Sequence, residues 1–160
     1  MLKSKHLIGL EHFPVSDLNK IIDTSFKFKD ILQTESRKAI LLKGKTIVNM
    51  FFENSTRTKI SFSLAEKRLG ADSINFSAST SSVKKGETLK DTVQNIESMK
   101  IDGAVIRHGH PGSALKLTEY IDGAVINAGD GSHEHPTQAI LDMVTLKEKF
   151  GKIKGLKVGT

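Results

Sequence analysis

The chain has 160 residues, no cysteine, and 24 lysine and arginine residues against 18 aspartate and glutamate residues, which gives a net charge of +6. This length is sufficient for one domain with its own core, and the absence of cysteine excludes a disulfide framework, zinc fingers and thiolate catalysis. The sequence contains no apolar run long enough to span a membrane, and its N-terminus is too polar for a signal peptide, so we expect a cytoplasmic protein.

The first half of the chain predicts two helices around a buried strand. Ser16 can cap a helix in which the apolar residues of positions 18–32 recur near the helical period. Residues 46–52 are rich in apolar and β-branched side chains without a helical stripe, which predicts a buried strand. The next helix is expected over about residues 58–69, and Gly70 can take the left-handed conformation that ends it.

Strands and helices also alternate in the second half. This alternation predicts the α/β class, with a parallel sheet of about four strands and helices on both faces, in which ligands bind where strands end and helices begin. The pentapeptide DGAVI occurs twice, and two equivalent strands leaving the same edge of the sheet explain it better than a duplication does. The expected elements are strands over 73–77, 102–108 and 122–128 and helices over about 89–99, 114–120 and 136–150.

We assign residues 1–150 to one domain. The last segment, KIKGLKVGT, resembles a turn into a new strand that stops after a few residues. We therefore expect residues 151–160 to be a linker and the start of a second domain that this chain lacks. A short edge strand is an equally acceptable interpretation of the same residues.

The stretch FFENSTRT places hydroxyl side chains and one arginine where a strand turns into a helix. The first turn of a helix has free N–H groups and a positive dipole end, which favour an anion. Ser55, Thr56 and Thr58 add hydroxyl donors, and Arg57 adds a planar cation suited to phosphate oxygens. Ordinary N-capping by a hydroxyl residue is the alternative, but it does not explain Arg57. Neither a P-loop nor a dinucleotide-binding glycine motif is present.

Two motifs identify a family resemblance. FFENSTRT fits the pattern F-x-E-x-S-T-R-T of the aspartate and ornithine carbamoyltransferases, and HPTQ at 135–138 fits their second signature, in the right order and at a compatible spacing. SSVKKGETLKDT, between them, resembles the aspartate branch of the family. The resemblance covers nearly the whole chain but only the N-terminal, carbamoyl-phosphate half of the family's catalytic subunit.

The resemblance implies a site for carbamoyl phosphate with three parts. Arg107 and His135 would contact the carbonyl oxygen, and Gln138 would bind the carbamoyl NH₂. Ser81 and Lys85 would come from a neighbouring subunit, which implies a homotrimer. The third part would hold the phosphate, with its last residue also near the carbonyl oxygen: Ser55, Thr56, Arg57 and Thr58.

The resemblance also implies a reaction, in which the carbamoyl group passes from carbamoyl phosphate to L-aspartate to give N-carbamoyl-L-aspartate and phosphate in pyrimidine synthesis. Attack by the amine builds negative charge on the carbonyl oxygen, which fixed donors stabilise, and no metal or cofactor is required. The catalytic residues would be Arg57, Thr58, Arg107, His135 and Gln138. In the family, aspartate binds through the second domain, so we expect negligible turnover from this chain alone. A regulatory chain is compatible with the resemblance.

Other chemistry-bearing residues have simpler interpretations. His108 with His110 and His133 with His135 have the H-x-H spacing of some metal ligands, but zinc sites usually need three or four ligands, so we expect no metal. For the two carboxylates next to the second signature, we prefer turn and capping roles over acid–base catalysis. These carboxylates are Asp130 and Glu134.

Three alternatives to the aspartate enzyme stay open. The ornithine enzyme is the nearest, because its distinguishing residues lie largely in the half that is absent here. A non-catalytic phosphate-binding or assembly module is the second. Nucleic-acid binding driven by the charge of +6 is the third, but the chain has one tyrosine, no tryptophan and no nucleic-acid motif, so we expect no nucleic-acid partner.

Overall fold

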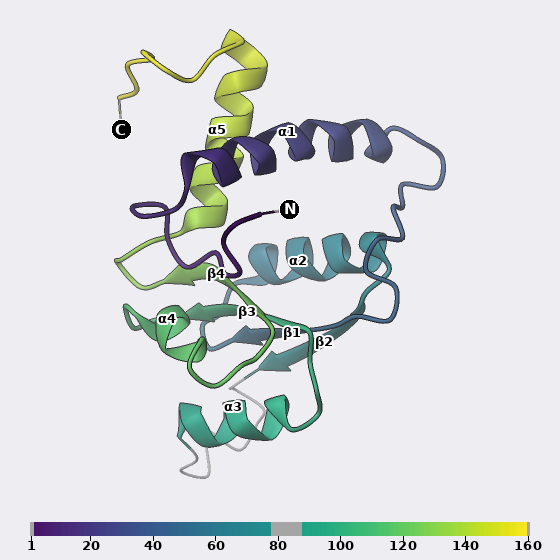
Figure 1. Cartoon of the computed structure of the whole chain (residues 1–160), viewed down its shortest axis with the longest axis vertical. Coiled ribbons are helices and arrows are strands. Elements are labelled where there is room, and N and C mark those ends of the chain that lie inside the picture. The colour runs from purple at the N-terminus through teal and green to yellow at the C-terminus, as the bar shows by residue number, and fades with distance from the viewer. Residues whose placement is uncertain (1, 78–87, 160) are drawn as a thin grey trace.

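The computed structural model describes residues 2–77 and 88–159. Figure 1 shows helices packed on the two faces of a central sheet. The elements, in chain order, are α1 (Val15–Leu32), β1 (Thr46–Phe51), α2 (Thr56–Leu69), β2 (Asp72–Ser77), α3 (Leu89–Glu97), β3 (Gly103–His108), α4 (Ser113–Leu117), β4 (Ala124–Asp130) and α5 (Pro136–Phe150).

The described strands form one four-stranded parallel sheet in the order β2-β1-β3-β4. The predicted α/β class and the parallel sheet are therefore confirmed. The two DGAVI segments form the neighbouring strands β3 and β4, as expected for equivalent strands. From β1 the chain winds outward to β2 on one side and then returns to β3 on the other side. The carboxyl ends of β1 and β3 thus flank the point where the winding reverses, where open α/β sheets bind their ligands.

Apolar side chains cover both faces of this sheet. Figure 1 shows α1, α2 and α5 on one side of the sheet and α3 and α4 on the other. The apolar cluster on the face of the sheet that α2 covers is small. It includes Phe51, Val105 and Ala128, and Phe62 of α2 packs against them. The larger cluster, which includes side chains from α3 and α4, contains Val48, Met50, Val93, Ile101, Ala104, Ile106, Ala114, Leu117, Ile121 and Val125.

Most predicted boundaries agree with the structure. Gly70 ends α2 in a left-handed conformation, with φ of 83°. Pro136 begins α5 and Gly151 follows it, as predicted. The predicted cap at Ser16 is wrong, because α1 already begins at Val15. Pro14 precedes it, and the fixed φ of a proline allows the helix to start directly after it.

The segment after α5 does not form the expected strand. Residues 151–159 contain a turn and no strand, and no neighbouring strand pairs with them among the described residues. A strand needs a partner for its backbone N–H and C=O groups, and none of the described strands supplies one to this segment. Within the described residues, no helix is both long enough and apolar enough to cross a membrane.

Candidate active site at the carboxyl edge of the sheet

The carboxyl edge of the sheet carries a cavity of about 730 Å³. The N-terminus of α2, the end of β3 and the start of α5 meet there. The lining residues are Ser55, Arg57, Thr58, Ser61, Phe62, Ala65, Arg107, His135, Thr137, Gln138 and Leu141. The structure therefore brings together six of the expected site residues from three separate parts of the chain.

Three expected residues are not in this lining. Thr56 is the first residue of α2 and is exposed, but it does not line the cavity. Ser81 and Lys85 lie outside the described residues.

The start of α2 differs from an ordinary capped helix. Ser55 occupies the N-cap position, yet its side chain makes no capping hydrogen bond. Its hydroxyl instead donates to Oγ1 of Thr58, over 2.9 Å. The N-terminal N–H groups are therefore not satisfied by the Ser55 side chain, and the helix end carries a partial positive charge of about half an elementary charge. With Arg57 exposed next to it, this end of α2 is suited to an anion.

Arg107 is held from two sides at the end of β3. Its Nη1 donates to the carbonyl oxygen of Ala128 over 3.0 Å, and its Nε lies 3.4 Å from Oε2 of Glu53. The side chain is only 24% exposed, so packing restricts its orientation. Sequence reasoning missed Glu53, although this residue is the glutamate of the first motif. The ion pair gives Arg107 a counter-charge, and the hydrogen bond to Ala128 restricts the position of its guanidinium group.

His135 immediately precedes α5 and faces the same cavity. Burial, and then the charge of Arg107, lower the pKa of His135 below its ordinary value. The imidazole is consequently neutral at pH 7, with one ring nitrogen protonated and available to donate. Nδ1 lies 3.3 Å from the hydroxyl of Thr137, a contact that helps to fix the ring.

Gly129 makes the close approach of these two side chains possible. A Cβ at this position would lie 2.7 Å from Nη1 of Arg107 and 3.2 Å from Cδ2 of His135. The residue also has φ of 117°, which side-chain-bearing residues rarely adopt. We did not identify Gly129 from the sequence, and the only signal was a glycine at the end of a predicted strand.

Asp130 organises the loop before His135, in agreement with the turn interpretation, but neither Asp130 nor Glu134 makes a side-chain cap of α5. Asp130 is only 1% exposed, and its carboxylate accepts hydrogen bonds from the backbone N–H groups of Gly112 and Glu134. Burial alone would raise the pKa of Asp130, but these hydrogen bonds and one from the Asn127 amide lower the pKa overall. The Glu134 side chain is also engaged, because it accepts from a backbone N–H of the N-terminal segment.

Two histidines outside the cavity, His108 and His133, have structural partners. The ring of His108 packs on Phe52, with 5.0 Å between ring centroids, and its Nδ1 accepts from the backbone N–H of His110. Nδ1 of His133 lies 3.1 Å from the Asp130 carboxylate. Within the described residues, no group of three or more metal-ligating side chains is placed to hold an ion.

Comparison with known proteins places this geometry in a family. Residues 5–148 match the family model described as "Aspartate/ornithine carbamoyltransferase, carbamoyl-P binding domain". The chain belongs to this family. It is 53% identical over 157 residues to the aspartate carbamoyltransferase catalytic subunit of Christiangramia forsetii, an alignment that covers 98% of this chain and 51% of that protein. The corresponding subunit of Desulfotalea psychrophila is 53% identical over 152 residues, covering 95% and 48%.

Solved structures of the family have the same fold. The aspartate transcarbamoylase of Trypanosoma cruzi, in complex with carbamoyl phosphate and aspartate, superimposes with a TM-score of 0.88 at 34% identity, covering 97% of this chain and 48% of that one. The catalytic subunit of M. jannaschii aspartate transcarbamoylase gives a TM-score of 0.87 at 41% identity, covering 96% and 50%. The chain spans about half the length of these family members.

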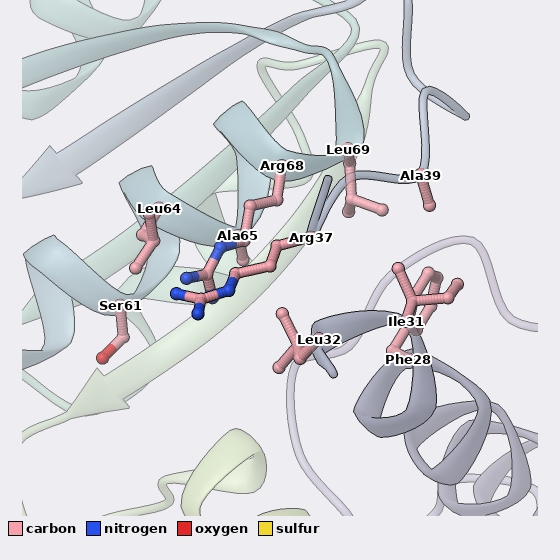
Figure 2. A pocket seen from close by; sticks show the side chains of 10 residues that line it. All are labelled: Phe28, Ile31, Leu32, Arg37, Ala39, Ser61, Leu64, Ala65, Arg68 and Leu69. Atoms are coloured by element: carbon pink, nitrogen blue, oxygen red, sulfur yellow. The ribbon is translucent and has the colours of Figure 1, made fainter. Parts of the chain in front are cut away.

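A second cavity of about 370 Å³ lies between the end of α1 and the outer face of α2. Figure 2 shows Leu32 and Leu64 on opposite sides of it, with the guanidinium groups of Arg37 and Arg68 projecting between the two helices. Its lining contains Ser61 and Ala65 in common with the first cavity, but none of the expected site residues. It is therefore distinct from the candidate active site of this family member.

Proposed function

We propose that this chain is the carbamoyl-phosphate-binding half of an aspartate carbamoyltransferase. The observation that carries the proposal is that the N-terminus of α2 faces Arg107, His135 and Gln138 across one cavity. One end of this cavity suits a phosphate, and the other suits a small planar group that has a carbonyl oxygen and an NH₂. Carbamoyl phosphate contains these two parts, and the related T. cruzi enzyme was solved in complex with it.

The chemistry follows from where charge develops. When an amine attacks the carbamoyl carbon, the C–N bond forms and negative charge grows on the carbonyl oxygen, next to Arg107 and the neutral His135. Donors that are already fixed there stabilise the transition state more than the ground state. The C–O bond to phosphate then breaks and the proton of the attacking amine passes to the departing phosphate, which leaves as the dianion HPO₄²⁻. Arg57 with the α2 N–H groups stabilises this dianion.

The amine substrate in this proposal is L-aspartate. The support comes from curated relatives that are 53% identical to this chain and are aspartate enzymes, and from the stretch SSVKKGETLKDT. Because the chain spans about half of those relatives, we propose that residues 151–160 lead into a second domain that binds aspartate. We expect the isolated chain to produce negligible N-carbamoyl-L-aspartate. The ornithine enzyme and a non-catalytic phosphate-binding module are the alternatives that turnover by the full-length protein would decide.

The proposed assembly is a homotrimer in the cytoplasm, with Ser81 and Lys85 completing the phosphate site of a neighbour. Exposed apolar side chains support an assembly surface, because Ile60 and Leu64 of α2 and Ile74 of β2 all face solvent. β2 is also an edge strand of the described sheet. Exposed apolar side chains on neighbouring elements of this kind favour association. A regulatory chain remains compatible with the proposal.

The test is a calorimetric titration of carbamoyl phosphate and of inorganic phosphate into this chain and into the Arg57→Ala variant. Loss of a charge-assisted contact should lower the affinity for both ligands by about tenfold or more. Lys67→Ala is the matched control, because it removes one exposed positive charge from the other end of α2. Equal affinities of the chain and the Arg57→Ala variant would contradict the proposed phosphate site.

A further inference from the structure

The orientation of the Gln138 side-chain amide decides what this end of the cavity recognises. A glutamine amide has an acceptor oxygen and a donor NH₂ of nearly equal size. With Oε1 toward the cavity it binds an NH₂ group, and with Nε2 toward the cavity it binds a carbonyl. Gln138 lies in the first turn of α5 and is exposed, so packing alone does not fix which atom points inward.

Asp142 supplies the missing constraint. It follows Gln138 by four residues on α5, so the two side chains lie on the same face of the helix. Nε2 of Gln138 donates to Oδ1 of Asp142 over 3.0 Å. A carboxylate has acceptor oxygens and no donor, so only the NH₂ of the amide can face it. The contact leaves Oε1 as the acceptor that Gln138 can present to a ligand.

We propose that Asp142 is a positioning residue that makes the site selective for an acyl phosphate bearing an NH₂ group. This inference rests on the proposed function, because it assigns a partner to the NH₂ of carbamoyl phosphate. Asp142 does not line the cavity itself, so it acts through Gln138. It selects by orienting the amide, and the phosphate contacts at α2 are independent of it.

Three ligands separate this role from a general effect on stability. Inorganic phosphate tests the α2 end alone. Acetyl phosphate has a methyl group in place of the NH₂, so it cannot donate to Oε1 of Gln138. Carbamoyl phosphate alone should use the amide. The preference for carbamoyl phosphate over acetyl phosphate therefore measures the orientation of Gln138.

The experiment is a titration of all three ligands into the chain and into Asp142→Ala, Asp142→Glu and Glu148→Ala. We expect Asp142→Ala to lower the preference for carbamoyl over acetyl phosphate by about three- to tenfold, the value of one hydrogen bond, with phosphate affinity unchanged within about twofold. Asp142→Glu should restore the preference, because its carboxylate also reaches a residue one turn away. Glu148→Ala removes the same charge from α5 at its contact with Lys29, and it should change neither the ligand preference nor the phosphate affinity.

Each other outcome is decisive. An undiminished preference in Asp142→Ala would overturn the inference, and so would an equal loss for all three ligands, which is the signature of a purely structural role. If Glu148→Ala had the same effect as Asp142→Ala, charge alone would be responsible and the inference would again fail. Failure of the unmodified chain to bind any of the three ligands would instead overturn the proposed function, and the inference with it.

Discussion

The two ends of the candidate site are built in different ways. The phosphate end is local, because Ser55, Arg57 and Thr58 are nearly consecutive and the start of one helix positions them. The carbamoyl end is assembled from distant parts of the chain, since Arg107 lies at the end of β3 and His135 precedes α5. The local end needs only a correct strand-to-helix turn, whereas the distant end needs β3, β4 and the loop before α5 to pack correctly.

The same contrast appears beneath the site. The carbamoyl end is placed by strands that share the large apolar core. The helix of the phosphate end, α2, packs on the sheet through Phe62 and also through a buried carboxylate, Glu66. Substitutions at the distant end should therefore abolish recognition of the carbamoyl group, whereas substitutions under α2 should change stability in a pH-dependent way.

The largest effect is expected from Gly129→Ala. Its Cβ would clash with Arg107 and come into tight contact with His135, and its φ of 117° is strained for alanine. We expect the affinity advantage of carbamoyl phosphate over inorganic phosphate to fall by about a hundredfold. The reason is that the proposed contacts of Arg107 and of His135 with the carbonyl oxygen would be lost together. Calorimetric titration of the two ligands measures this advantage directly.

A matched control separates the clash from the strain. Gly151 also has a positive φ, of 72°, but a Cβ there would meet no atom within 4 Å. Gly151→Ala should lower stability by about 1 kcal/mol and leave the ligand preference unchanged. If Gly129→Ala likewise lowered stability and left the ligand preference unchanged, the close packing of Arg107 against Gly129 would be irrelevant to recognition.

The next effect concerns the phosphate end and its proposed partner subunit. Arg57→Ala and Lys85→Ala should each bind carbamoyl phosphate weakly. In randomly mixed trimers of the two variants, a site that takes Arg57 from one chain and Lys85 from its neighbour is intact. About a quarter of the sites should then regain full affinity, because each of the two contributions is correct half of the time. Ligand titration after co-refolding measures this fraction, and no recovery on mixing would place both residues in one subunit's own site.

Sequence reasoning succeeded where the determining interactions are local. The strand-to-helix turn before α2, the glycine that ends it and the proline that begins α5 each depend on neighbouring residues only, and each was predicted. The strands were predicted too, because most of them are short runs of apolar and β-branched residues without a helical stripe.

The features that sequence reasoning missed depend on tertiary contacts. Glu53 and Gly129 matter only because Arg107 packs between them, and nothing local reveals that approach. The predicted Ser16 cap failed for a different reason, since a proline nearby already started the helix. The expected strand after Gly151 was apolar enough in pattern but has no described strand to pair with.

Glu66 gives the smallest of the expected effects. It is 5% exposed, and its Oε2 accepts from Nδ2 of Asn49 over 2.8 Å and from the hydroxyl of Ser73. Its Oε1 is buried without a hydrogen-bond partner among the described residues. Burial raises the pKa of Glu66, although the two hydrogen bonds oppose this shift. The folded state thus holds the carboxyl proton more tightly than the unfolded state does.

A raised pKa in the folded state means that stability falls as the pH rises from about 4.5, the ordinary value for glutamate, through the folded value. Glu66→Gln removes this dependence, because its amide oxygen still accepts from Asn49 and Ser73 and carries no charge. We expect the variant to be more stable than the unmodified chain by about 1 kcal/mol at pH 8 and to lose that advantage toward pH 4.5. Urea unfolding at the two pH values measures the difference. If Glu66→Gln were more stable than the unmodified chain by the same amount at both pH values, packing, and not the buried charge, would distinguish the two side chains.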